Sequence, residues 1–443
     1  MEQQSLKRTL TPLLLWGLGV GYVISGMYFG WNLGLEKGGT AGLAIATAVI
    51  VILYTAFTFG YAELACAIPK AGGGFDYARR ALGNDWGFIA GMAQAIEFIL
   101  APPAIAFAIG AYFNLFLPQV SIINIAIAAY VLFTALNIYG VRAAALFELI
   151  ITFLAVAELL LFAGIALPEF KWTHLQQNAL PNGVEGIFAS IPFAIWFFLG
   201  IEGVANVAEE TINPQKTILK GFGSAILTLI ILCMLTFTAS VGVAGWEAIV
   251  YTADGKSSDS PLPLALGLIV GNDHGLYHLL IAIGLFGLVA SFHGLTLAAG
   301  RASFELGRLR FAPPFLGKIH KKFQTPAIAL LVNMTIGIIA LLTGKTAEII
   351  TISVFGAITL YVISMISLLV LRKKEPDLAR PFRVPFYPLT PIVALVIGII
   401  ALLAMLYENH LLGGIYLGII ALAFLLYKLF YTSSTNKASS SYE

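Results

Sequence analysis

The chain has 443 residues, of which 59% are hydrophobic and 11% are charged, and its mean hydropathy is +0.90. Soluble domains carry about 25% charged residues, so this composition excludes a water-soluble globular fold. The net charge of +2 is too small to indicate a nucleic-acid partner. Both cysteines, Cys66 and Cys233, lie inside apolar runs, which argues against a disulfide framework or a thiolate metal site.

Apolar runs longer than about 18 residues recur along the chain and predict an all-α polytopic membrane protein. We expect twelve membrane-spanning helices, near 12–34, 40–67, 86–117, 121–139, 143–167, 185–209, 217–245, 275–306, 326–343, 347–371, 391–408 and 411–430. An even number places both termini on one side, and the positive-inside rule makes that side the cytoplasm. Of the 25 basic residues, all but four fall on it, the exceptions being Lys37, Lys171, Lys256 and Lys345.

Two of the predicted spans are interrupted by glycines. The first contains Gly17 to Gly30 with five glycines in that stretch, and in the sixth Gly200 and Gly203 flank a carboxylate, Glu202. Glycine weakens a helix, and an acid at bilayer depth costs roughly 2.5–3.5 kcal/mol on insertion scales. Broken helices at matching places in two halves of opposite orientation are typical of inverted-repeat transporters.

This pattern predicts five segments. They are a cytoplasmic N-terminus (1–11), a first repeat of five spans (12–167), a second repeat of five spans (185–371), two appended spans (391–430) and a disordered cytoplasmic tail (431–443). Between the second and third spans, Pro69 to Arg80 reads as a glycine turn that leads into a short basic helix on the cytoplasmic surface.

Four carboxylates lie within or at the edges of the apolar runs, and no lysine or arginine lies comparably deep. They are Glu63, Glu97, Glu158 and Glu202. Such acids must be protonated or bind cations. We interpret Glu63 as structural and Glu97 and Glu202 as binding residues for an ammonium or a proton, with packing roles as the alternative. Glu158 is either a proton carrier or a neutral buried acid.

Two further side chains and one motif need interpretation. Trp196, six residues before Glu202, is expected to close over a cavity, and His293 either packs between helices or touches the site. Gly344-Lys345-Thr346 resembles the end of a phosphate loop, but Ile339 stands where that motif needs glycine. The deep residues offer no metal cluster and no nucleophile–base pair, so we expect no metal, no cofactor and no enzymatic activity.

Several motifs resemble the amino acid–polyamine–organocation superfamily. They are Tyr61-Ala-Glu-Leu, Ile68-Pro-Lys-Ala-Gly-Gly, Phe197-Phe-Leu-Gly-Ile-Glu and Glu209-Glu-Thr-Ile-Asn-Pro. The resemblance covers the first ten spans and implies a five-plus-five inverted-repeat fold with broken helices 1 and 6, and an alternating-access carrier. It also implies that Trp196 gates a substrate site that includes Glu202. The remaining residues implied to line that site are Ile24, Ser25, Gly26, Met27, Leu199, Gly200 and Ile201.

Within the superfamily, the stretches Gly21 to Asn32 and Glu97 to Ala106 look most like the ethanolamine permeases. This likeness implies a bacterial inner-membrane carrier that imports ethanolamine or a similar small cationic amino alcohol. The alternative is an amino-acid or polyamine permease or exchanger of the same fold, and a transporter-fold sensor or a channel is a reading from another class. Many proton-coupled relatives carry a lysine on the fifth span, where this chain has Glu158, so Glu158 and Glu202 are the candidates for proton coupling.

Overall fold

The computed structural model describes residues 8–70, 72–139 and 144–430, and within these ranges the chain is helical, with two isolated β-bridges and no β-strand. The predicted tail (431–443) and the basic residues Lys7, Arg142 and Lys437 lie outside the described residues. The elements are α1 (Pro12–Val23), α2 (Ser25–Tyr28), α3 (Asn32–Ala67), α4 (Gly74–Leu82), α5 (Asn84–Asn114), α6 (Ile122–Tyr139), α7 (Ala144–Ala166), η1 (Leu167–Glu169), α8 (Trp172–Gln176), α9 (Gly183–Ala189), α10 (Ile191–Trp196), η2 (Ile201–Glu210), α11 (Pro214–Ala244), α12 (Glu247–Val250), α13 (Pro261–Val270), α14 (Gly275–Arg308), α15 (Ala327–Leu341), α16 (Thr346–Lys374), α17 (Leu389–Glu408) and α18 (His410–Phe430).

These helices are those of a multi-pass membrane protein. In the described ranges, ten helical segments are long and apolar enough to cross a bilayer, by length and composition. Each predicted span coincides with one helix or with consecutive short ones, and the sixth covers α9, α10 and η2. Helices α1 and α15 are apolar but fall below the spanning length. The all-helical membrane class is therefore confirmed, whereas the count of twelve and the inverted repeat stay predictions.

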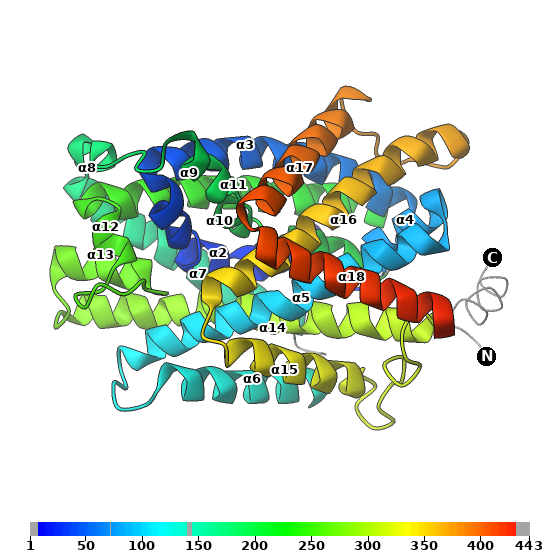
Figure 1. The fold of residues 1–443 in the computed structure, drawn as a ribbon. Coiled ribbons are helices and arrows are strands. Elements are labelled where there is room, and N and C mark those ends of the chain that lie inside the picture. The colour runs from blue at the N-terminus through cyan, green and yellow to red at the C-terminus, as the bar shows by residue number, and fades with distance from the viewer. Residues whose placement is uncertain (1–7, 71, 140–143, 431–443) are drawn as a thin grey trace.

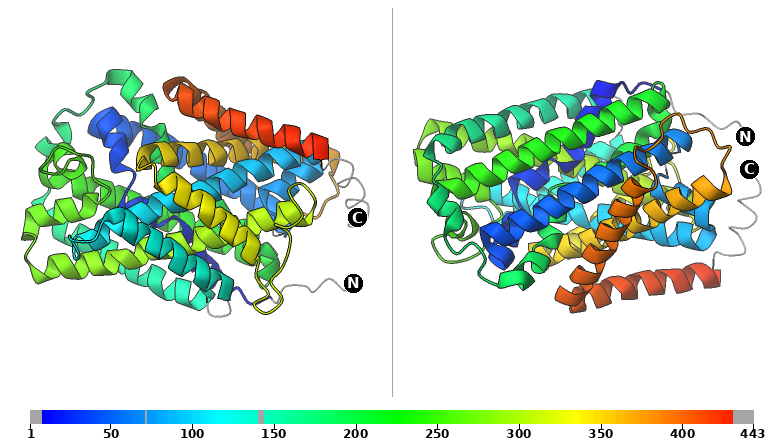
Figure 2. Two further views of the ribbon diagram at one scale, coloured as in Figure 1. Left: turned by 60° about the horizontal axis from the view of Figure 1, so that its bottom comes forward. Right: turned by 90° about the horizontal axis from the view of Figure 1, so that it is seen from above.

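Most of the long helices run along one common direction, so that they form a bundle (Figure 1). Helix α5 packs against both α14 and α16, and most residues of these three helices are buried inside the bundle. Helices α17 and α18 lie along one side of the bundle (Figure 2), and large apolar side chains on both remain exposed. Such exposure suits helices that face lipid.

Both glycine-interrupted spans are broken in the structure. Helix α1 ends at Val23, α2 continues for one turn, and Phe29 is then extended, before Gly30 adopts a φ of +87°. Helix α10 ends at Trp196, and Gly200, with a φ of +95°, precedes the 3₁₀ helix η2. Positive φ is a conformation that glycine adopts at little cost. The two glycines therefore make these breaks possible.

The segment from Pro69 to Arg80 differs from its prediction. It forms α4, but this helix is largely buried, with Phe75, Tyr77 and Ala78 almost inaccessible. It packs against α5 and α16, and a methyl group added at Gly73 would lie 2.8 Å from the side-chain oxygen of Asn206 on η2. The two arginines drew the interpretation toward the surface, whereas the aromatic face of the same helix turns into the bundle.

Glu63 holds the end of α3 to the end of α16 and to the segment that follows α16. Its carboxylate accepts hydrogen bonds from Nε and Nη2 of Arg372 and from the N–H of Val384, each 2.7 Å long. Arg380 Nε lies 3.4 Å from the same carboxylate, and the Glu63 side chain is 1% exposed. This arrangement agrees with the structural role that the sequence predicted for Glu63.

We expect Glu63→Gln to destabilise the folded protein by about 3–5 kcal/mol, because breaking a buried pair leaves uncompensated charge. The matched control is Glu375→Gln. Its pair with Arg80 is 2.6 Å long but partly exposed, and hydrogen bonding from Arg80 lowers the pKa of Glu375. Exposed pairs contribute about 0.2–1 kcal/mol. Thermal unfolding of the detergent-purified variants would measure both effects, and equal shifts for the two would contradict this account.

Candidate functional site

The two broken helices touch each other at their breaks. A methyl group added at Gly26 would lie 2.5 Å from the carbonyl oxygen of Trp196 and 3.1 Å from Cα of Phe197. The indole Nε1 of Trp196 donates a 3.0 Å hydrogen bond to the carbonyl of Phe29, and the two rings meet edge to face. Trp196 therefore bridges both breaks, which is a position suited to the gating role predicted for it.

Two carboxylic acids from different spans meet beside these breaks. Glu97 on α5 and Glu202 on η2 are both 0% exposed. The two carboxyl groups lie close enough to influence each other, but no hydrogen bond of ordinary geometry joins them. The backbone N–H of Gly200 is a further neighbour of Glu97. In the described part of the chain, both carboxyl oxygens of Glu97 and Oε1 of Glu202 have no hydrogen-bond partner. Burial of such acceptors is costly, so the pair is suited to a proton or to an ammonium group, which supplies three donors.

A pair of tyrosines orients Glu202. The hydroxyl of Tyr361 on α16 donates a 2.7 Å hydrogen bond to Glu202 Oε2. The hydroxyl of Tyr54 on α3 lies 3.1 Å from that of Tyr361, and it also donates to the carbonyl of Ile195 over 3.4 Å. Sequence reasoning missed both residues, because among 17 tyrosines spread along the chain nothing distinguishes these two.

Glu97 is held by close packing of α5 against α16. A methyl group added at Gly356 would meet the carbonyl oxygen of Ala93 and the backbone nitrogen of Glu97. The hydroxyl of Ser353, one turn earlier on α16, donates a 3.0 Å hydrogen bond to the carbonyl of Glu97. The missing side chain at Gly356 thus lets α16 approach α5 at the level of the carboxyl pair.

The other residues predicted near the breaks are buried, and most of them act through their backbone. The N–H of Ser25 donates a 2.9 Å hydrogen bond to Ser291 Oγ on α14, which in turn donates to the carbonyl of Gly21 over 2.7 Å. The carbonyl of Met27 accepts a 3.1 Å hydrogen bond from Trp31 Nε1. The side chains of Ile24, Leu199 and Ile201 belong to the apolar core around the breaks.

Contacts close the bundle on both sides of the broken helices. On one side, Asn32 Nδ2 donates a 2.7 Å hydrogen bond to the carbonyl of Ser258, and Thr346 donates to Asp259 over 3.2 Å. Burial raises the pKa of Asp259, which lies in a loop, to about 6. On the other side, Arg301 on α14 pairs with Glu210 at the end of η2 over 3.1 Å. Since Glu97 and Glu202 are also 0% exposed, the site is enclosed in this structure.

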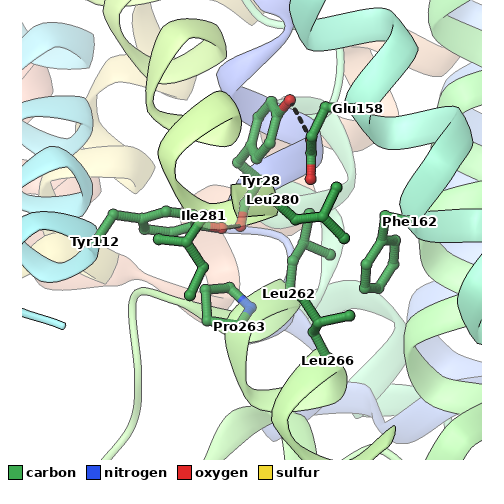
Figure 3. Close-up of a pocket in the computed structure, with 9 residues that line it drawn as sticks. All are labelled: Tyr28, Tyr112, Glu158, Phe162, Leu262, Pro263, Leu266, Leu280 and Ile281. Atoms are coloured by element: carbon green, nitrogen blue, oxygen red, sulfur yellow. Dashed lines mark hydrogen bonds between the residues drawn. The ribbon is translucent and has the colours of Figure 1, made fainter. Parts of the chain in front are cut away.

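Glu158 lies in a different place, beside α2. Figure 3 shows its carboxylate accepting a hydrogen bond from the hydroxyl of Tyr28, 2.6 Å long, while Tyr112 donates to the carbonyl of Tyr28. These side chains line a cavity of about 10 Å³, which has room for about one water molecule. Apolar residues of α13, among them Leu262 and Leu266, form the opposite wall. Glu158 thus orients Tyr28 and does not join Glu97 and Glu202.

His293 is also drawn away from the carboxyl pair. Its Nδ1 lies 3.6 Å from Oε2 of Glu148 on α7, and its carbonyl accepts a 3.3 Å hydrogen bond from Asn137 on α6. Sequence reasoning missed Glu148, because an acid near the start of the predicted span 143–167 is as easily interfacial as buried. In the structure it is 2% exposed. In the described ranges, no cluster of three or more His, Cys, Asp or Glu side chains is suited to a metal ion.

A model of the amino acid permease family matches residues 11–427 of this chain. An uncharacterized transporter of Rhizobium meliloti (strain 1021) is 30% identical over 413 residues, which cover 89% of this chain and 86% of the relative. The branched-chain amino acid permease BcaP of Bacillus subtilis (strain 168) is 28% identical over 419 residues, covering 89% of this chain and 87% of the relative. The serine/threonine exchanger SteT of the same organism is 25% identical over 413 residues, covering 89% and 90%.

Proposed function

Because the chain belongs to the amino acid permease family, we propose that it is a secondary transporter that carries amino acids by alternating access through the site between its two broken helices. The observation that carries this proposal is the buried pair of Glu97 and Glu202, whose unfilled acceptors lie beside the breaks. An α-ammonium group would supply the donors that the pair lacks. Trp196 would close over the bound substrate, and backbone groups of Ile24 to Met27 and of Leu199 to Ile201 would line the site.

The comparisons favour amino acids over ethanolamine. The permease and the exchanger named above are described as acting on branched-chain amino acids and on serine and threonine, and neither is an ethanolamine permease. One observation keeps ethanolamine as a second candidate. The ionisable neighbours of Glu97 and Glu202 within the described residues are acids and tyrosines, with no lysine or arginine to meet a substrate carboxylate. A cationic amino alcohol would suit such a site.

The topology belongs to the same proposal. Ten spans in a five-plus-five inverted repeat and two appended spans would place both termini on the cytoplasmic side of a bacterial plasma membrane. The distribution of basic residues supports this orientation. The salt bridge between Lys428 on α18 and Asp85 at the start of α5 places the end of the last helix beside the start of the third predicted span. The predicted topology assigns both of these ends to the cytoplasmic side.

A ligand panel tests the substrate class. Thermal unfolding of purified protein would be followed with alanine, serine, leucine, arginine, putrescine, ethanolamine and choline. We expect amino acids to raise the unfolding temperature and choline to leave it unchanged, because a quaternary ammonium has no N–H to donate. At 100 times its Kd a ligand stabilises the folded state by about 2.7 kcal/mol. Stabilisation by ethanolamine alone would select the second candidate, and none from any amine would overturn the proposal.

A further inference from the structure

A further buried acid lies outside the carboxyl pair and takes no part in the proposed substrate site. Glu148 on α7 has a side chain that is 2% exposed, and the imidazole of His293 on α14 is its ionisable partner, with Nδ1 3.6 Å from Oε2. The other oxygen, Oε1, has no hydrogen-bond partner in the described part of the chain. A buried acceptor of this kind is costly unless it is protonated or meets a donor.

The carboxyl group of Glu148 fills a space that α1 leaves open. A methyl group added at Gly21 would lie 2.5 Å from Glu148 Oε1 and 2.8 Å from Thr152 Oγ1. Thr152 also donates a 3.2 Å hydrogen bond to the carbonyl of Gly17. Helix α1 is the helix whose break carries Ser25 and Gly26, so a displacement of α1 would change the surroundings of Glu148 and of the substrate site together.

Few other ionisable groups face this pair. From α1, the phenol of Tyr22 interacts with Glu148, and it also interacts with Arg301 on α14 and Glu210 on η2. From α6, Asn137 donates to the carbonyl of His293, and the ring of Phe133 lies against the imidazole. The charge of the pair is therefore set chiefly by how many protons Glu148 and His293 hold between them.

Protonation of this pair must be linked to the position of α1. When Glu148 and His293 hold one proton between them, the pair is neutral overall. Adding a second proton, or removing the first, leaves a net charge in a region of low dielectric. Packing of α1 against Glu148 keeps water away, so that a charged state is costly, and withdrawal of α1 would admit water and lower that cost. Two positions of α1 therefore have different affinities for the proton, and by linkage the proton biases the position of α1.

We propose that Glu148 and His293 form a proton-binding site that couples proton movement to the opening and closing of the substrate site. The inference rests on the proposed transport function. It assigns coupling to this pair, whereas the sequence predicted Glu158 and Glu202 for that role. The His293 side chain is the more exposed of the two, at 11% against 2% for Glu148.

The test uses full-length protein in liposomes that contain a pH-sensitive dye. Two readouts are compared, namely proton entry on addition of the amino acid that the ligand panel identifies and counterflow of the same substrate at equal pH on both sides. We expect Glu148→Gln to reduce substrate-driven proton entry about tenfold or more, within the range of measured coupling between sites. Counterflow should persist, because exchange needs no net proton movement. His293→Asn should act in the same direction, and it carries the test if Glu148→Gln does not fold.

The matched control is Glu169→Gln, an exposed acid just after α7, which should keep both activities. Wild-type counterflow without any proton movement would overturn the proton site and leave the transport function standing. Wild-type protein that shows no counterflow would overturn the transport function and this inference with it. Equal loss of counterflow and proton entry in both variants would show that Glu148 and His293 have a structural role and do not couple protons. Loss of proton entry in Glu158→Gln alone would assign coupling to Glu158.

Discussion

Glu97→Gln is expected to weaken substrate binding and uptake by about 30-fold or more. The amide keeps the shape of the side chain but removes its charge, and it places an NH₂ group beside Glu202, where the site needs acceptors for an ammonium. Losing one member of a buried, hydrogen-bonded charge pair costs about 2–5 kcal/mol, which corresponds to this range of affinity. Glu202→Gln should act similarly, since Tyr361 would still hold the side chain in place.

The control for this prediction is Glu185→Gln. Glu185 belongs to α9, on the same predicted span as Glu202, but it is exposed. Its replacement should leave binding within about twofold of wild type, because surface substitutions are usually within 0.5 kcal/mol. Calorimetric titration of the three variants would measure the difference. Unchanged affinity in Glu97→Gln, with the fold intact, would remove Glu97 from the substrate site.

Gly26→Ala is expected to abolish transport even though it adds a single methyl group. That methyl would lie 2.5 Å from the carbonyl oxygen of Trp196 and 3.1 Å from Cα of Phe197, and both neighbours are backbone atoms. No rotamer change can relieve the contact, so the two broken helices must separate. Overpacking of this kind costs about 1–3 kcal/mol of stability, and the displaced breaks would no longer form the site.

Gly223→Ala is the matched control, since its added methyl group would meet no atom within 4 Å, inside the regular helix α11. It should be neutral or stabilising by about 0.5–1 kcal/mol, the ordinary gain from replacing a helical glycine. Unfolding temperature and substrate uptake would be measured for both variants. Wild-type behaviour of Gly26→Ala in both assays would mean that the breaks are not in such close contact.

The sequence predicted the helical membrane class because long apolar runs have few other stable structures in a bilayer. It also predicted interruptions in the first and sixth spans, from the five glycines between Gly17 and Gly30 and from Gly200 and Gly203 around Glu202. The sequence predicted the exact ends of helices, and short additional helices, less well. The apolar helix α13 (Pro261–Val270) lines the cavity beside Glu158, but its ten residues are too few to resemble a membrane span.

The meeting of side chains from distant spans could not be read from the sequence. Glu97 and Glu202 were each chosen as deep acids, but their proximity depends on how far α5 and η2 are rotated and shifted against each other. The same rotation decides that His293 faces Glu148 and that Glu158 faces Tyr28. Periodicity places a residue on one face of a helix and leaves open which helix lies opposite.

Counterflow in proteoliposomes tests the central claim most directly. Vesicles loaded with unlabelled amino acid would be diluted into labelled amino acid, with no gradient of protons or voltage. An alternating-access carrier predicts transient, saturable accumulation of label, stimulated by internal substrate and absent in Glu97→Gln. A sensor would give no uptake above empty vesicles, and a channel would give entry that neither saturates nor responds to internal substrate. Either result would contradict the proposal that this chain carries its substrate through a closed site between two broken helices.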